Sequence, residues 1–174
     1  MRYRIRQIRQ LCSRVVLLGV LVLSLFLGLG AIATRPAAAE IGQIQEAPDL
    51  FLYKSLYSLR DRAGNSWQVV LFKQVKGGQV ASVNLRLVGF PGLARFSHPA
   101  ALTIKTATGN LFKAEDMFAE TAPAANVGQY DVKDILLQLP ATEQLRLYLP
   151  TVKTSAELPV PPPVVLEWQT IVSF

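Results

Sequence analysis

The sequence predicts an all-β domain, a mainly antiparallel β-sandwich or open barrel with one or two short helices, behind an N-terminal signal or transmembrane helix. Three observations lead to this prediction. Residues 67–92 have the pattern of a β-hairpin, and roughly six or seven short alternating stretches are separated by turn signals. The first 39 residues have the pattern of a secretory signal. We therefore expect a flexible lead-in over 40–50 and a single β-rich domain over 51–174.

The N-terminal segment contains the three parts of a secretory signal. Five arginines without an acidic residue come first, an unbroken apolar run over 15–33 follows, and the small residues 37–39 stand directly before Glu40. These parts predict cleavage after Ala39 and export to the periplasm or the thylakoid lumen. The apolar run is 19 residues long, close to the length of a membrane span, so an uncleaved anchor remains an alternative.

Removal of this signal changes the charge balance of the protein. The chain has 18 basic and 12 acidic residues, and six of the basic residues precede Glu40. Taking these six from 18 leaves 12, so the mature part is formally neutral. A neutral domain lacks the basic surface that nucleic acid requires, and we expect no nucleic-acid partner. Cys12 also lies in the signal, so the mature part has no disulfide and no thiolate chemistry.

The hairpin over 67–92 is the centre of the predicted sheet. In its second half three apolar residues alternate with Ser82, Asn84 and Arg86, so that one face is buried and the other faces solvent. The apolar positions are Val83, Leu85 and Leu87. Residues 67–72 are apolar on both faces, which is typical of a central strand covered on both sides. Gly77 and Gly78 supply the positive φ angles of a short loop.

The other elements are shorter. Residues 51–59 fit either a strand or a helical stripe, and their aromatic content favours a strand. Strands are also predicted at 102–105 and 145–149, helical turns at 113–120, and a helix over 131–139 that Asp131 would cap. Prolines make 159–163 a stiff extended segment. A final strand is expected to point Val164, Leu166, Trp168 and Val172 inward.

Catalytic and metal-binding patterns are weak. His98 is the only histidine, its neighbour Ser97 would point away from it on an extended chain, and no G-x-S-x-G elbow occurs. A structural histidine before Pro99 is therefore expected, and an exported hydrolase is the third hypothesis. The usual zinc ligand sets cannot be assembled, and we expect no metal and no cofactor. The acidic groups are interpreted as a solvated helix face (Glu115, Asp116, Glu120) and a helix cap (Asp131, Asp134).

The candidate binding residues lie on the loop after the hairpin: Phe90, Arg95, Phe96 and His98. Loops on a rigid scaffold commonly carry binding residues, and aromatic and arginine side chains are enriched in interfaces. The alternative is that the loop aromatics tuck under the edge of the sheet. Trp67 and Trp168 are assigned to the core, with a groove for an apolar ligand as the alternative.

Five short motifs carry a resemblance to a known family: Trp67, the turn 89–92 (GFPG), His98-Pro99, 127–131 (VGQYD) and 166–168 (LEW). Together they resemble exported cyanobacterial proteins that share the domain of unknown function 3122. The resemblance implies a photosynthetic bacterium and export to the periplasm or thylakoid lumen, and it supplies no catalytic residue.

These observations predict a non-enzymatic protein that binds a protein partner, such as a membrane complex. Contact with the membrane itself is expected only through the N-terminal segment, if that segment stays attached. A binding protein for a small apolar ligand is the second hypothesis.

Overall fold

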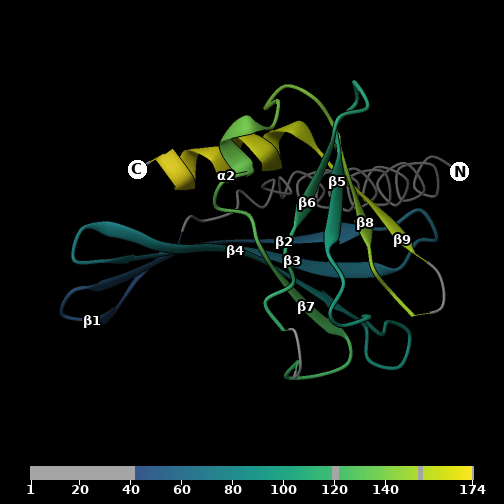
Figure 1. The fold of residues 1–174 in the computed structure, drawn as a ribbon, viewed down its shortest axis with the longest axis horizontal. Coiled ribbons are helices and arrows are strands. Elements are labelled where there is room, and N and C mark those ends of the chain that lie inside the picture. The colour runs from purple at the N-terminus through teal and green to yellow at the C-terminus, as the bar shows by residue number, and fades with distance from the viewer. Residues whose placement is uncertain (1–41, 119–121, 153–154, 174) are drawn as a thin grey trace, which may run out of the picture. The chain divides into compact units, whose positions relative to one another are not determined.

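Two antiparallel sheets and a C-terminal helix make up the described part of the chain, residues 42–118, 122–152 and 155–173 of a computed structural model (Figure 1). The expected signal segment lies outside these residues. The elements are β1 (Gly42–Ala47), β2 (Leu50–Arg60), β3 (Ser66–Lys76), β4 (Gln79–Gly89), β5 (Leu102–Lys105), β6 (Leu111–Ala114), β7 (Val127–Asp131), the 3₁₀ helix η1 (Leu136–Gln138), β8 (Leu145–Leu149), β9 (Ala156–Val160) and α2 (Pro162–Ser173). The prediction of a mainly antiparallel β-fold is confirmed.

The larger sheet has the strand order β1-β2-β3-β4-β7, and its centre is the predicted hairpin. β3 and β4 pair from Trp67 opposite Gly89 to Lys76 opposite Gln79, and Gly77 and Gly78 take positive φ angles in the turn. β2 is a strand, as its aromatic content predicted. The inner face of β3 is buried, but Val70 and Phe72 on the other face are only half-buried, so the expected cover on both faces is wrong.

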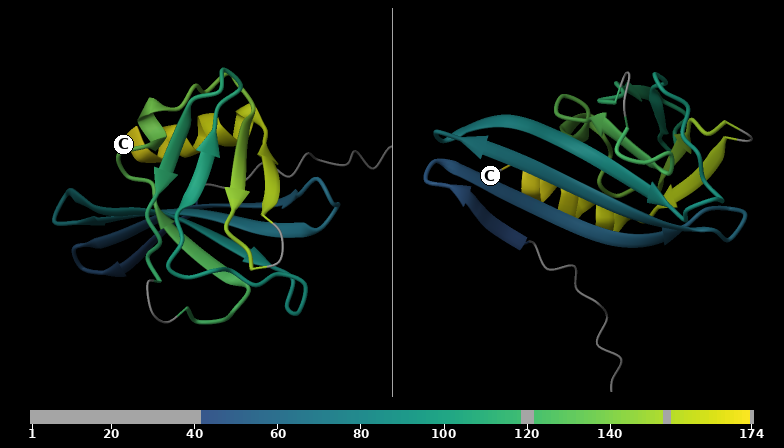
Figure 2. Two further views of the ribbon diagram at one scale, coloured as in Figure 1. Left: turned by 45° about the vertical axis from the view of Figure 1, so that its right-hand side comes forward. Right: turned by 90° about the horizontal axis from the view of Figure 1, so that it is seen from below.

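The smaller sheet has the order β6-β5-β8-β9, and its strands cross those of the larger sheet (Figures 1 and 2). The strands predicted at 102–105 and 145–149 are β5 and β8. Backbone hydrogen bonds join the two sheets at two places, near β7 and near β9. The Met117 N–H donates to Gln129 of β7 (2.8 Å), and the Arg62 N–H donates to Glu157 of β9 (3.1 Å). The loops at the ends of the strands are therefore held on one connected scaffold.

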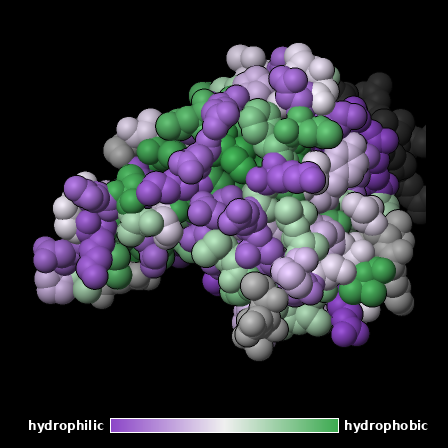
Figure 3. Space-filling view, viewed as in Figure 1, coloured by the Kyte–Doolittle hydropathy of each residue, from purple (hydrophilic) through white to green (hydrophobic). Residues whose placement is uncertain are grey.

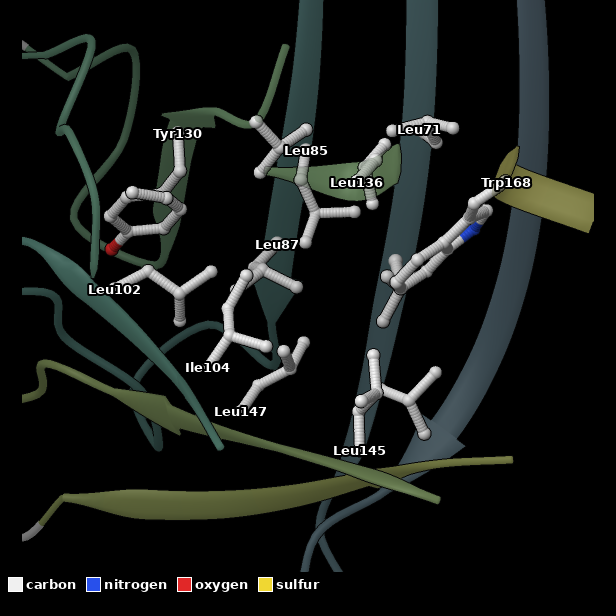
Figure 4. Close-up of a cluster of buried hydrophobic side chains, with 14 of the residues drawn as sticks. Leu71, Leu85, Leu87, Leu102, Ile104, Tyr130, Leu136, Leu145, Leu147 and Trp168 are labelled. Carbon is white, nitrogen blue, oxygen red and sulfur yellow. The ribbon is translucent and has the colours of Figure 1, made fainter. Parts of the chain in front are cut away.

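The core lies between the two sheets and the helices (Figure 4). Leu71, Leu85 and Leu87 of the larger sheet point toward side chains of β5 and β8 and toward Trp168 of α2. Both tryptophans are buried, as predicted. A fully buried leucine of this kind contributes about 1.5–3 kcal/mol through removal of its surface from water.

The C-terminal segment is a helix, and the predicted strand over 164–173 is wrong. Pro162 and Pro163 occupy the first turn of α2, where no intrahelical N–H bond is needed and the fixed φ favours a helix. The buried residues of α2 recur at helical spacing: Val164, Val165, Trp168 and Ile171. The extended segment predicted for 159–163 is likewise divided, because Pro159 and Val160 lie in β9 and Pro162 and Pro163 in α2.

Three further segments differ from their predictions. Residues 42–47 of the expected lead-in form β1, which pairs with β2. Lys113 and Ala114 belong to β6 and Asp116 forms a bridge with Tyr130, so the described part of 113–120 is extended instead of helical. Residues 119 and 120 lie outside the described residues. Asp131 ends β7 and accepts a hydrogen bond from the Lys133 N–H (2.9 Å), and only the 3₁₀ turn η1 follows.

Candidate functional site

The four candidate residues after β4 point in two directions. Phe90 and Arg95 are exposed, while Phe96 is buried and His98 nearly so. The loop turns back at Phe90, whose carbonyl accepts hydrogen bonds from the N–H groups of Leu93 and Ala94 (both 3.2 Å). The structure therefore divides the predicted set into an outer pair and an inner pair.

The inner pair belongs to an aromatic cluster. Phe96 contacts Trp67 edge to face with the ring centroids 5.8 Å apart, and Tyr130 and His98 lie at 6.3 and 6.2 Å. Gly128 makes this packing possible, because a Cβ there would lie 2.9 Å from the Phe96 ring and 2.7 Å from the Tyr130 hydroxyl. These two residues thus match the alternative prediction, loop aromatics tucked against the sheet.

His98 pairs with Asp116. The ring Nδ1–H donates to Asp116 Oδ2 at 2.6 Å, and the same carboxylate accepts the N–H groups of Ala100 (3.2 Å) and Phe118 (3.0 Å). The prediction of Asp116 on a solvated helix face is wrong, since its side chain is buried. Burial raises the pKa of Tyr130 above its ordinary value, and the Asp116 charge raises it further.

A histidine oriented by a carboxylate is one part of a hydrolytic triad. His98 Nε2, the atom that would take a proton from a nucleophile, is buried and has no hydrogen-bond partner among the described residues. A substrate in solvent does not reach this atom in the described conformation. Ser97 is held through its backbone N–H, which donates to the Pro150 carbonyl (2.8 Å).

Arg95 lines a pocket of about 820 Å³, which we call the loop pocket, whereas Phe90 lies on the same loop outside the lining. Residues from three segments line the loop pocket: 61–67, which runs from the end of β2 into β3; 92–95 after β4; and the described residues of 151–157, which run from the end of β8 into β9. The second and third segments are tied together, because the Val152 N–H donates to the Arg95 carbonyl (3.0 Å) and Phe96 bridges to Thr151. His98 does not line this pocket.

The carboxylate of Asp61 fixes one wall of the loop pocket. It accepts hydrogen bonds from the Trp67 indole (3.0 Å), the Asn65 side chain (3.0 Å) and the Asn65 backbone N–H (2.8 Å). Burial raises the pKa of Asp61, but these hydrogen bonds outweigh burial and leave the pKa below its ordinary value. The wall is therefore formed by a charged and fully bonded carboxylate.

The rim of the loop pocket combines arginines with exposed apolar residues. Arg62 pairs with Glu157 (2.9 Å), whereas no residue in the described ranges pairs with the Arg95 side chain. Leu93 and Val152 line the pocket and are 72% and 57% exposed, and Phe90, three positions before Leu93 on the same loop, is 65% exposed. Figure 3 shows part of this end at the lower right, where hydrophobic and hydrophilic residues lie side by side.

Of the four predicted binding residues, only Arg95 lines the loop pocket, and Trp67, which the sequence places in the core or in an alternative apolar groove, lines it as well. Sequence reasoning interpreted 60–66 as a plain turn, although an aspartate four residues before an asparagine is a signal for side-chain bonding inside a turn. An apolar Leu93 in a glycine- and proline-rich loop was the second available signal. The contribution of 151–157 depends on contacts between distant segments, which the local pattern does not contain.

Fold and pocket together define an antiparallel β-domain with a partly apolar pocket, which is lined by the loops that follow β2, β4 and β8. A family model described as "protein of unknown function (DUF3122)" matches residues 39–171, and the chain belongs to this family. The match confirms the family to which the sequence motifs pointed, while the cyanobacterial origin and the export stay predictions. Searches of curated proteins and of solved structures gave no match.

Over 42–118, 122–152 and 155–173, no helix has the length and hydropathy of a membrane span. Within the same residues, no three His, Cys, Asp or Glu side chains are grouped as metal ligands.

Proposed function

We propose that this protein is a non-enzymatic binding protein that recognises a protein partner through the loop pocket and its apolar rim. The observation that carries the proposal is the exposure of Leu93 and Val152 in the lining of a pocket of about 820 Å³, with the exposed Phe90 on the same loop as Leu93. Large apolar side chains clustered at an exposed site are typical of protein interaction surfaces. Three loop segments on a hydrogen-bonded scaffold give such a surface a fixed shape, which lowers the entropic cost of binding.

The proposed location is the periplasm or the thylakoid lumen, and a membrane complex is a fitting partner. The basic, apolar and small-residue parts of 1–39 support export, and the cyanobacterial resemblance supports these two compartments. N-terminal sequencing of the native protein tests this location. A start at Glu40 means release from the signal, and a start at Met1 means retention of the apolar run as an anchor.

Site-specific photocrosslinking tests the binding proposal directly. A crosslinking amino acid at Leu93 is expected to capture a defined partner protein in intact cells. The matched control is Leu111 on β6, which is similarly exposed (63%) but does not line the loop pocket. Equal capture at both positions, or none at Leu93, contradicts the proposal.

A small apolar ligand is the second candidate, because the volume of the loop pocket falls in the range of small-molecule sites. The interior between the sheets is less suited to this role, since core side chains fill it. Native mass spectrometry of the purified protein separates the candidates. A bound small molecule that disappears in a Leu93→Trp variant favours this alternative.

A further inference from the structure

We infer that the loop pocket takes a segment of a partner protein in which a carboxylate stands next to a large apolar side chain. This inference rests on the proposed function and adds the chemistry of the partner. It follows from which charged groups of the pocket are already engaged within the protein and which are not.

Both acidic groups in the pocket lining are engaged. Asp61 accepts the hydrogen bonds from Asn65 and Trp67 described above. Glu157 lies between two arginines, with its Oε1 2.9 Å from Arg62 Nε and 3.6 Å from Arg146 Nε. The protein itself therefore already compensates the charge of both carboxylates, Asp61 through hydrogen bonds and Glu157 through ion pairs alone, since Glu157 Oε1 accepts no hydrogen bond from the described residues. The formal charge of the lining is balanced.

The basic groups in the lining remain accessible. The Arg95 side chain is exposed and unpaired among the described residues. Arg62 contacts Glu157 through Nε, and its side chain is 63% exposed, so further N–H groups of its guanidinium face solvent. Arginine binds carboxylates with two parallel hydrogen bonds, which fixes orientation as well as charge. The pocket is therefore complementary to a carboxylate.

The apolar part of the site extends beyond the pocket. Leu93 and Val152 are exposed residues of its lining, Ala94 also lines it, and Phe90 lies outside the lining on the same loop. A small acid inside the pocket leaves Phe90 uncovered, whereas a protein segment that places one apolar side chain in the pocket also covers the rim. The extent of this apolar surface is the reason for choosing a protein segment over a small molecule.

Selection of short random peptides with free carboxyl termini against the full chain tests the inference. The enriched peptides are expected to pair Asp, Glu or the terminal carboxylate with Leu, Ile or Phe. Amidated peptides, and peptides with Asp or Glu changed to Asn or Gln, then show which carboxylate binds. Arg95→Gln is expected to weaken binding about tenfold, Arg95→Lys less, and added salt is expected to weaken the wild type more than Arg95→Gln.

The control is Lys113→Gln on β6, an exposed cation outside the pocket, which is expected to bind like the wild type. Enriched peptides without a carboxylate, unchanged binding by Arg95→Gln, or no enrichment at all overturns the inference. Photocrosslinking at Leu93 does not depend on Arg95. If a partner is captured at Leu93 but Arg95→Gln binds as tightly as the wild type, only the inferred carboxylate of the partner is overturned. If no partner is captured at Leu93, the proposed function is overturned as well.

Discussion

At the scale of single residues, the site depends on carboxylates whose partners lie close in space. Trp67 was assigned to the core from its position in an alternating strand. The identity of its partner was not predictable, because the indole reaches back across the turn to Asp61. The partner of His98 was equally hidden, since Asp116 lies 18 positions away and is brought close by the pairing of β5 with β6. Strand patterns predict which side chains are buried, but they do not predict which buried polar groups meet.

Asp61→Asn is expected to lower the free energy of unfolding by about 1–3 kcal/mol, because an amide cannot accept all the hydrogen bonds that the carboxylate accepts. Urea titration of the two proteins measures this difference. Asp134→Asn, at an exposed position, is the control and should stay within about 0.5 kcal/mol of the wild type. Equal stability of Asp61→Asn and the wild type would show that the turn does not depend on the charge.

The same carboxylate predicts a pH dependence. Because the pKa of Asp61 is lower in the folded protein than in the unfolded chain, its stabilisation is fully present above the unfolded pKa of about 3.9. It is lost as the pH falls through the lowered folded pKa. The gap in unfolding free energy between the wild type and Asp61→Asn should therefore narrow below about pH 4. A gap that stays constant into strong acid would contradict the assigned direction.

His98→Ala is expected to affect stability and to leave partner binding unchanged. Removal of the ring takes one of three donors from the buried Asp116 carboxylate and opens space beside Phe96, and the lost hydrogen bond to a charged group alone costs about 1.5–3 kcal/mol. Thermal or urea unfolding measures the loss, and crosslinking through Leu93 measures binding. Loss of binding with stability intact would place His98 in the recognition surface.

At the scale of elements, the strands were largely predictable and the C-terminal helix was not. Residues 164–173 are rich in β-branched side chains, which favour strands locally, and Trp168 is inward at a period of two as well as at a helical period. Tertiary contacts decide for the helix. The Gln169 side chain donates to the carbonyls of Leu136 and Leu139, and the buried Lys73 ammonium donates to the Ile171 and Val172 carbonyls at the helix end (both 3.2 Å). A cation at this end also interacts favourably with the helix dipole.

Two alanine substitutions in α2, one as a reference and one as the diagnostic change, test whether this segment is a helix or a strand. Trp168→Ala should lower the free energy of unfolding by about 3–5 kcal/mol in either arrangement, because the ring is buried. Leu166→Ala is diagnostic, since Leu166 is 57% exposed on the helix but would point inward on the predicted strand. We expect a change within about 0.5 kcal/mol. A loss of about 2–5 kcal/mol is typical of a buried leucine and would support the predicted strand instead of the helix.

At the scale of the whole molecule, an all-β fold followed from alternation and turn signals, but the sheet order did not. β4 pairs with β7 and β5 pairs with β8, and each pairing joins segments separated by other elements. Backbone hydrogen bonds from Val152 to Arg95 and from Arg62 to Glu157 then join 61–67, 92–95 and the described part of 151–157, which line the loop pocket. The sequence could therefore indicate a binding loop after β4, whereas the pocket beside it exists only in the folded molecule.

The central claim is that partner contact occurs at the loop pocket. The most direct measurement is the affinity of the partner captured through Leu93 for the wild type, Leu93→Ser and Leu111→Ser. Both leucines are largely exposed, so neither change should unfold the protein. We predict that Leu93→Ser weakens binding about tenfold or more, as expected for an apolar anchor, and that Leu111→Ser binds like the wild type. Equal affinity of all three proteins would contradict the claim.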